Sequence, residues 1–214
     1  MGMLLMLMTV GGSIIAFLLL VFSLLTRKIW LRNFILGGIT VWFAFYFVML
    51  FGVSFLSEEK TLGFNEPKAF CGFYFDCHMH TAVSGLRKTK TIGGTEANGE
   101  FYVVKVKVLS DAKRAELNLY APKFEVVNEN GERYEPVKKL TPPGDDFERK
   151  VPAGSDFESE VVFDLPVDVK NPRLDVSEGI GIDKVIESIL IGDEDSIFHK
   201  RRYFKLESEQ IASR

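Results

Sequence analysis

Two long apolar stretches lie at the start of the chain. Residues 3–25 and 34–56 contain no Asp, Glu, Lys, Arg or His. A helix needs about 20 consecutive apolar residues to cross a hydrocarbon core ~30 Å thick, so each stretch is long enough to span a membrane. We therefore predict a transmembrane helical hairpin over residues 1–56, with a connecting loop at 26–33.

The only ionisable residues of the connecting loop are Arg27, Lys28 and Arg32, and they are the only Asp, Glu, Lys, Arg or His residues of the hairpin. Short loops rich in Lys and Arg stay in the cytoplasm, which predicts a two-pass protein of a bacterial cell membrane with its N-terminus and its C-terminal domain outside the cytoplasm. The alternative for residues 3–25 is a cleaved signal peptide. A retained helix is favoured because the stretch has no basic residues before it and is longer than the usual apolar region of a signal peptide.

A polar linker over residues 57–68 leads into a domain that we place at 69–206. Short runs with alternating apolar positions or β-branched residues, each ended by turn residues, predict an all-β immunoglobulin-like sandwich. The clearest strand has Val104, Val106 and Val108 on one face and lysines on the other. The predicted extended segments are 70–83, 100–109, 115–120, 123–127, 156–165 and 173–176.

Three further features complete the expected architecture. Asn130 and Gly131 separate two extended runs and predict a hairpin turn, because both residues tolerate a positive φ. Residues 182–190 have apolar residues at helical spacing, which predicts one short C-terminal helix. Residues 197–206 read as extended, and 207–214 as a polar tail.

Charge narrows the range of partners. The chain has 29 Asp and Glu and 26 Lys and Arg. Three of the basic residues lie in the hairpin, which has no acidic residue, so the exported part has a formal charge of −6. This balance and the lack of a basic, aromatic-rich cluster argue against nucleic acid. The expected partners are the lipid bilayer and another protein of the cell envelope.

Four segments of the domain resemble a known family. They are the valine-rich run 101–108, the segment 124–136 with its Asn-Gly turn, Val-Pro-Ala-Gly-Ser at 151–155 and Val-Val-Phe-Asp-Leu-Pro at 161–166. Together they resemble the telokin-like, immunoglobulin-fold extracytoplasmic domains of bacterial lipoproteins and membrane-anchored proteins. The resemblance implies an interaction or accessory module outside the cell membrane. It covers residues 101–176, so the cysteine-rich segment before it and the helix and tail after it are departures from the family pattern.

Ten residues near the start of the domain hold both cysteines and two of the three histidines of the chain. Cys71, Cys77, His78 and His80 are candidate ligands for zinc or copper, because both metals bind thiolate and imidazole groups. Thiolate together with the thioether of Met79 favours copper(I). Strand alternation puts the two histidines on one face and the sulfur-containing residues on the other. A shared ion therefore needs a turn, or a further ligand such as His199 or a second subunit.

A disulfide between Cys71 and Cys77 is the structural alternative, since the predicted compartment is oxidising. Six extended residue steps of ~3.3 Å separate two Cα atoms by about 20 Å, whereas a disulfide allows about 7 Å. A disulfide therefore requires a tight loop at residues 72–76. The sequence leaves three alternatives open here: a disulfide, a metal site, or two free buried thiols.

Two functions fit these features. The first is a non-catalytic, membrane-anchored accessory or protein-interaction module of the cell envelope, without a cofactor. The second is an envelope metal-binding protein that uses the segment from Cys71 to His80 for copper or zinc. An enzyme is not expected, because the sequence has no Gly-x-Ser-x-Gly, His-Glu-x-x-His or phosphate-binding loop.

Overall fold

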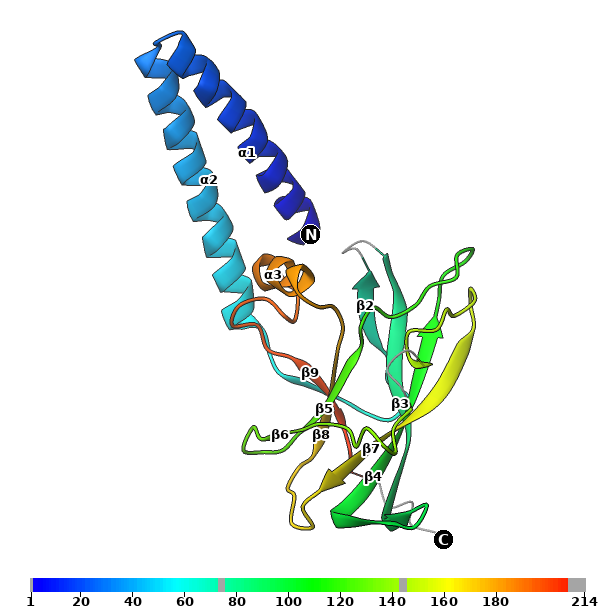
Figure 1. Cartoon of the computed structure of the whole chain (residues 1–214). Coiled ribbons are helices and arrows are strands. Elements are labelled where there is room, and N and C mark those ends of the chain that lie inside the picture. Colours follow the sequence, from blue (N-terminus) through cyan, green and yellow to red (C-terminus); the bar gives the residue numbers. More distant parts are fainter. Residues whose placement is uncertain (1, 73–75, 143–145, 208–214) are drawn as a thin grey trace. The chain divides into compact units, whose positions relative to one another are not determined.

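The first compact unit of the protein is built on two long helices (Figure 1). The structure is a computed structural model that describes residues 2–72, 76–142 and 146–207. Helix α1 covers Gly2–Leu25 and helix α2 covers Ile29–Leu56. Helix α2 begins five residues before the predicted span and takes Arg32 into its first turns. The connection shrinks to Thr26–Lys28, where Arg27 adopts a positive φ of 55°.

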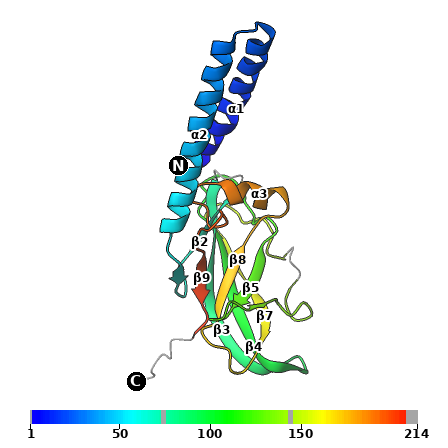
Figure 2. The same ribbon diagram turned by 90° about the vertical axis from the view of Figure 1, so that its left-hand side faces the viewer.

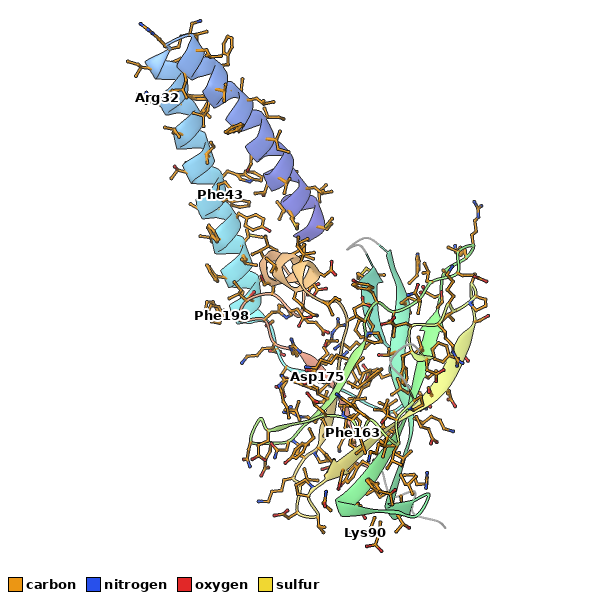
Figure 3. All side chains as sticks on the ribbon, in the orientation of Figure 1. Arg32, Phe43, Lys90, Phe163, Asp175 and Phe198 are labelled. Atoms are coloured by element: carbon orange, nitrogen blue, oxygen red, sulfur yellow. A yellow bond between two sulfur atoms is a disulfide. The ribbon has the colours of Figure 1, made fainter. Side chains whose placement is uncertain are left out.

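The same unit includes residues 181–201. Helix α3 covers Ile182–Ile189 and confirms the predicted C-terminal helix. Residues 181–201 were expected within the sandwich domain, but they cluster with α1 and α2 instead. Figure 3 shows Phe198 of this segment beside the C-terminal end of α2.

The second unit is a β-sandwich of two sheets, seen from a second direction in Figure 2. It confirms the predicted architecture, a helical hairpin followed by an all-β sandwich with one short helix. The five-stranded sheet has the order β1 (Lys60–Leu62), β9 (Arg202–Lys205), β8 (Arg173–Ser177), β5 (Lys123–Val127) and β6 (Arg133–Tyr134). The four-stranded sheet has the order β2 (Lys68–Gly72), β3 (Asp76–Ile92), β4 (Thr95–Ser110) and β7 (Asp156–Leu165).

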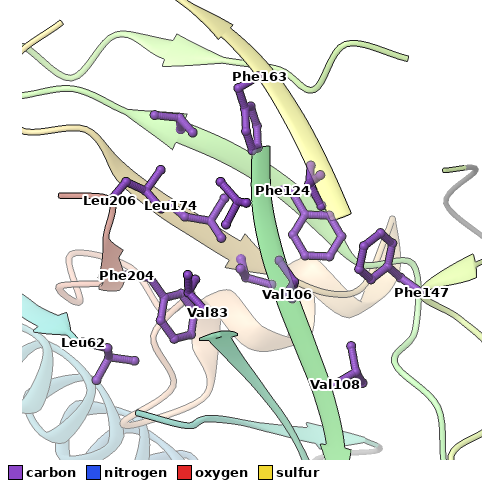
Figure 4. Close-up of a cluster of buried hydrophobic side chains, with 14 of the residues drawn as sticks. Leu62, Val83, Val106, Val108, Phe124, Phe147, Phe163, Leu174, Phe204 and Leu206 are labelled. Carbon is purple, nitrogen blue, oxygen red and sulfur yellow. The ribbon is translucent and has the colours of Figure 1, made fainter. Parts of the chain in front are cut away.

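Alternating side chains of β4 and β7 build much of the core between the sheets (Figure 4). Val104, Val106 and Val108 are fully buried, as the sequence pattern predicted. They share the core with Phe163 of β7 and Phe124 of β5. The Phe124 ring packs against Phe147 with 4.6 Å between the ring centroids. Apolar residues at every second position of a strand point to the same face of the sheet, so this pattern predicts that one face of each sheet is buried.

A buried cation links the two sheets. The Lys68 side chain of β2 is fully buried, and its Nζ donates hydrogen bonds to the backbone carbonyl oxygens of Val176 (2.6 Å) and Arg202 (3.3 Å). A buried ammonium group requires such partners, because removing it from water is costly. Lys68 thereby joins the four-stranded sheet to β8 and to the start of β9.

Several predicted turns and strands appear where expected, and others differ. The segment 70–83, expected as one extended run, is divided between the antiparallel strands β2 and β3, and of the segment 197–206 only Arg202–Lys205 is a strand. Gly131 has a φ of 81° at the turn between β5 and β6, which confirms the Asn-Gly hairpin. Residues 115–120 form no strand and contribute only a single bridge between Leu117 and Val151. Ala121 has a positive φ of 44° and Pro122 follows it, so the extended run cannot continue. The expected linker 57–68 contains β1, and the tail 207–214 lies almost entirely outside the described residues.

Candidate functional site

The cysteine-rich segment forms a hairpin at one end of the four-stranded sheet. Strands β2 and β3 pair antiparallel, with Phe70 opposite Met79 and Gly72 opposite Asp76. The ladder is irregular between Phe70 and Gly72. The antiparallel pairing brings Cys71 of β2 near Cys77 of β3, and the aromatic residues 73–75 lie outside the described residues.

Cys71 and Cys77 form a disulfide across this hairpin, with their Cα atoms 3.8 Å apart. The disulfide that the sequence offered as one of three alternatives is therefore confirmed. Both thiols of the chain are used in it, so thiolate ligation and free buried thiols do not describe this structure. The copper(I) hypothesis loses its soft donors, because Met79 is also turned into the sandwich core.

The two histidines of the hairpin converge on one carboxylate that the sequence did not single out. His78 Nδ1 lies 2.6 Å from Oδ1 of Asp111, and His80 Nε2 lies 3.3 Å from its Oδ2. The backbone N–H of Asp111 donates to the carbonyl oxygen of His78 at 3.0 Å, which holds the carboxylate beside β3. We call these three residues the His–Asp–His cluster.

Strand geometry explains why the cluster forms. His78 and His80 are two residues apart on β3 and therefore point to the same face of the sheet, away from the buried Met79. Asp111 follows the last residue of β4, and Ser110 pairs with Met79. The cluster is partly open to solvent, because the side chains of His78 and Asp111 are 54% and 57% exposed, whereas that of His80 is 16% exposed.

The cluster favours an ionised carboxylate. The hydrogen bond from His78 lowers the pKa of the Asp111 carboxyl, and the bond from His80 acts in the same direction. An ionised Asp111 can accept one hydrogen bond from an N–H group of each imidazole ring, and these two bonds fix the orientation of both rings. These contacts use Nδ1 of His78 and Nε2 of His80, so the second nitrogen of each ring takes no part in the bonds to Asp111.

The remaining predicted metal donors are not brought into this cluster. Among the residues that the structure describes, no group of three or more His, Cys, Asp and Glu side chains is arranged to hold a metal ion. His199 belongs to the first unit, where its Nδ1 lies 2.9 Å from the carbonyl oxygen of Lys200. The zinc or copper site therefore stays a prediction, with a smaller donor set than the sequence suggested.

The basic residues that set the predicted topology lie together at the connection between α1 and α2. Arg27 and Lys28 are exposed in the short turn, and Arg32 follows in α2. The two helices are long and apolar enough to cross a membrane by length and composition. The position of α1 near the N-terminus is one that a signal sequence also has.

Comparisons with known proteins give similarity in structure only. No protein-family model matches the chain, and no curated protein matches its sequence. The telokin-like resemblance therefore stays a prediction.

Three solved structures of bacterial proteins are similar to this chain. The secreted protein MPT63 from Mycobacterium tuberculosis is 14% identical, with a TM-score of 0.43, and the match covers 57% of this chain and 92% of that one. The yjhA protein from Bacillus subtilis is 14% identical, with a TM-score of 0.42 and coverage of 68% and 98%. An uncharacterized β-sandwich protein from Clostridium difficile is 10% identical, with a TM-score of 0.37 and coverage of 71% and 97%.

Proposed function

We propose that this protein is a membrane-anchored accessory module whose β-sandwich binds another protein of the cell envelope. The observation that carries the membrane-anchoring part of the proposal is the surface of α1 and α2. Large apolar side chains such as Phe17, Val41 and Val48 are exposed on these helices, which contain no acidic residue. Such a surface is stable in lipid and unfavourable in water.

The disulfide supports the sidedness of the proposal. Disulfides persist outside the cytoplasm and are rare inside it. Cys71 and Cys77 are in the sandwich, and Arg27, Lys28 and Arg32 lie at the connection of the helices. Both features agree with a sandwich outside the cytoplasm and a connection on the cytoplasmic side.

Labelling of introduced cysteines in whole cells tests this arrangement. The native cysteines are bonded to each other, so Lys170→Cys in the sandwich or Thr26→Cys in the helix connection supplies the only free thiol. We expect a membrane-impermeant maleimide to label Lys170→Cys in intact cells and Thr26→Cys only after permeabilisation. The reverse pattern overturns the sidedness, and a mature chain that lacks α1 by mass spectrometry shows a cleaved signal peptide instead.

The binding role needs its own test. A photo-reactive amino acid on the exposed faces of the sandwich should produce a reproducible crosslink to one envelope protein in intact membranes. The matched control carries the same amino acid at Phe17, within α1. If the sandwich positions give no crosslink beyond that control, the accessory role is wrong even when the anchor is correct.

The His–Asp–His cluster favours a second candidate function, which is binding of zinc or copper by His78 and His80. An imidazole held by a carboxylate is a better metal ligand than a free one, and removal of such a carboxylate weakens metal binding by about 10- to 100-fold. Calorimetric titration of the oxidised protein with Zn²⁺ and Cu²⁺ tests this role. We expect a His78→Ala, His80→Ala variant to lose binding, Asp111→Asn to weaken it, and His199→Ala to leave it unchanged. Equal binding by all four proteins refutes the site.

A further inference from the structure

Helix α3 exposes its apolar face and partly buries charged side chains, which is the reverse of a helix on the surface of a water-soluble protein. Ile182, Val185 and Ile189 are 72%, 63% and 40% exposed, and they lie on one face because they are three and four residues apart. The charged residues of the helix are more buried: the side chains of Lys184 and Glu187 are 34% and 13% exposed. A helix next to water normally buries its apolar face and exposes its charges.

Lys184 and Glu187 of α3 are paired within the same segment. Lys184 Nζ donates to Glu187 at 2.9 Å and to Asp195 at 2.6 Å, and Arg201 also pairs with Asp195. Burial raises the pKa of the Glu187 carboxyl from its usual 4.5 to about 7. Burial also raises the pKa of Asp193. A paired network of this kind lets the segment lie beside an apolar medium without an isolated charge in it.

Polar contacts fix this segment along α2. The Tyr46 hydroxyl donates to the carbonyl oxygen of Ile189 at 2.7 Å. Ser54 and Ser196 are joined by their hydroxyl groups at 3.4 Å, and the backbone N–H of Lys200 donates to the Ser57 hydroxyl at 2.8 Å. These contacts satisfy the hydroxyl groups of Tyr46 and Ser54 in α2 and of Ser57, which follows its last residue.

Apolar contacts extend the same interface. Ile191 is buried against Tyr46 and Leu50 of α2. The Phe198 ring stacks on Phe55 with 5.2 Å between centroids and contacts Phe51 at 6.1 Å.

Phe198 nevertheless stays 61% exposed, with a φ of 65°. A bulky residue rarely adopts a positive φ, and its surroundings must hold it there. The exposed ring is therefore held in place and continues the aromatic surface of α2.

The length of α2 sets the depth of these contacts. Its 28 residues are about 42 Å long at about 1.5 Å per residue. A hydrocarbon core of ~30 Å takes up about 20 residues, which reach Val53 when counted from Phe34. Tyr46 then lies in the outer half of the membrane, and Phe51 and Phe55 lie near its outer boundary.

We propose that residues 182–198 form a third membrane contact, in which Ile182, Val185, Ile189 and Phe198 enter the boundary between headgroups and acyl chains of the outer leaflet. This proposal rests on the membrane-spanning hairpin of the proposed function. The lipid surface is chosen as the occupant because the exposed Phe198 ring is continuous with the lipid-facing surface of α2 at Phe51 and Phe55. The exposed face of α3 belongs to the same segment, whose Ile189 carbonyl is bonded to Tyr46 of α2. Interfacial helices place an apolar face about 5–10 Å into this boundary and keep their charged groups on the other side.

Spin-label accessibility in the full chain tests the proposal. The protein is placed in nanodiscs of phosphatidylethanolamine and phosphatidylglycerol, and a nitroxide is attached to Ile182→Cys, Val185→Cys or Phe198→Cys. Phe17→Cys in α1 is the lipid control, and Lys170→Cys in the sandwich is the water control. Oxygen concentrates in lipid, whereas a nickel chelate stays in water, so the two relaxing agents separate the environments.

We expect labels at 182, 185 and 198 to show high oxygen and low nickel accessibility, as at 17. High nickel accessibility at these three sites, with the label at 17 in lipid, overturns the third contact and leaves the hairpin intact. Low accessibility to both agents overturns it in favour of a second copy or a protein partner. If the label at 17 is itself in water, the spanning hairpin of the proposed function fails first.

Discussion

The hydroxyl of Tyr46 offers the sharpest test of how residues 181–201 are held on the helical hairpin. Tyr46 is buried, and its Oη is 2.7 Å from the carbonyl oxygen of Ile189 at the end of α3. The change Tyr46→Phe removes this one hydrogen bond and keeps the ring that packs against Ile191. It therefore separates the polar contact from the apolar one.

The magnitude follows from the fate of the Ile189 carbonyl. A buried acceptor that loses its partner costs about 1–3 kcal/mol in proteins. Side-chain hydrogen bonds between membrane helices average lower, at about 0.6 kcal/mol with a maximum of about 1.7. We expect a loss of about 1–2 kcal/mol, which increases the open population of the segment by about 5- to 30-fold.

Hydrogen exchange measured by mass spectrometry in nanodiscs reports this opening directly. Peptides covering residues 186–200 should exchange about 5- to 30-fold faster in Tyr46→Phe, while β4 stays unchanged. The control is Tyr134→Phe, which removes the exposed hydroxyl contact to Glu132 at 3.1 Å and should leave residues 186–200 unaffected. Unchanged exchange in Tyr46→Phe, or equal acceleration in both variants, would show that the hydrogen bond does not hold the segment.

Three further predictions test other parts of the structure by hydrogen exchange. Replacing Cys71 and Cys77 by serine removes a short closed loop and should destabilise the sandwich by about 2 kcal/mol, seen as faster exchange of the most protected β4 amides; an unchanged rate refutes a stabilising disulfide. Gly131→Ala should destabilise the sandwich by about 1 kcal/mol, because Gly131 has a φ of 81°, whereas Gly63→Ala should be nearly neutral because nothing lies within 4 Å of its added Cβ; equal effects would contradict the turn. The pKa of Glu187 is raised to about 7 in the packed segment, so packing is strongest when this carboxyl is protonated and weakens as pH rises from 4.5 to 7. Exchange of residues 186–200, corrected for its intrinsic pH dependence, should therefore accelerate over that range and change less in Glu187→Gln; an equal pH response in both proteins would exclude this carboxyl as the cause.

The sandwich core was predictable because its signal is local. Val104, Val106 and Val108 alternate with lysines, and only one register puts them all on the buried face. The Asn130-Gly131 turn was predictable for the same reason, since two adjacent residues specify it. Residues 115–120 show the limit of such signals. Leu119 is buried, but the segment forms no strand, and its one β-bridge joins Leu117 to Val151.

The His–Asp–His cluster was only half visible in the sequence. The shared face of His78 and His80 followed from strand alternation, but Asp111 depends on the register between β3 and β4. Next to the turn Ile92 pairs with Thr95, and an unbroken ladder would put Met79 opposite Val108. Two irregularities shift the register, so Met79 pairs with Ser110 and His78 meets Asp111.

The orientation of α3 could not be predicted from the sequence, because it depends on the medium around the helix and not on the local pattern of residues. Helical periodicity identifies an apolar face over residues 182–189, but it does not say whether that face is turned toward the protein or away from it. In water the polar face of a helix is exposed, and in lipid the apolar face is exposed, because each medium solvates one of the two faces better. In this structure Lys184 and Glu187 are the half-buried residues and Ile182 and Val185 the exposed ones. The exposed fractions of these residues therefore show which face of α3 is turned outward, which the periodicity alone does not. An apolar face turned outward is expected of a helix that lies at the membrane boundary.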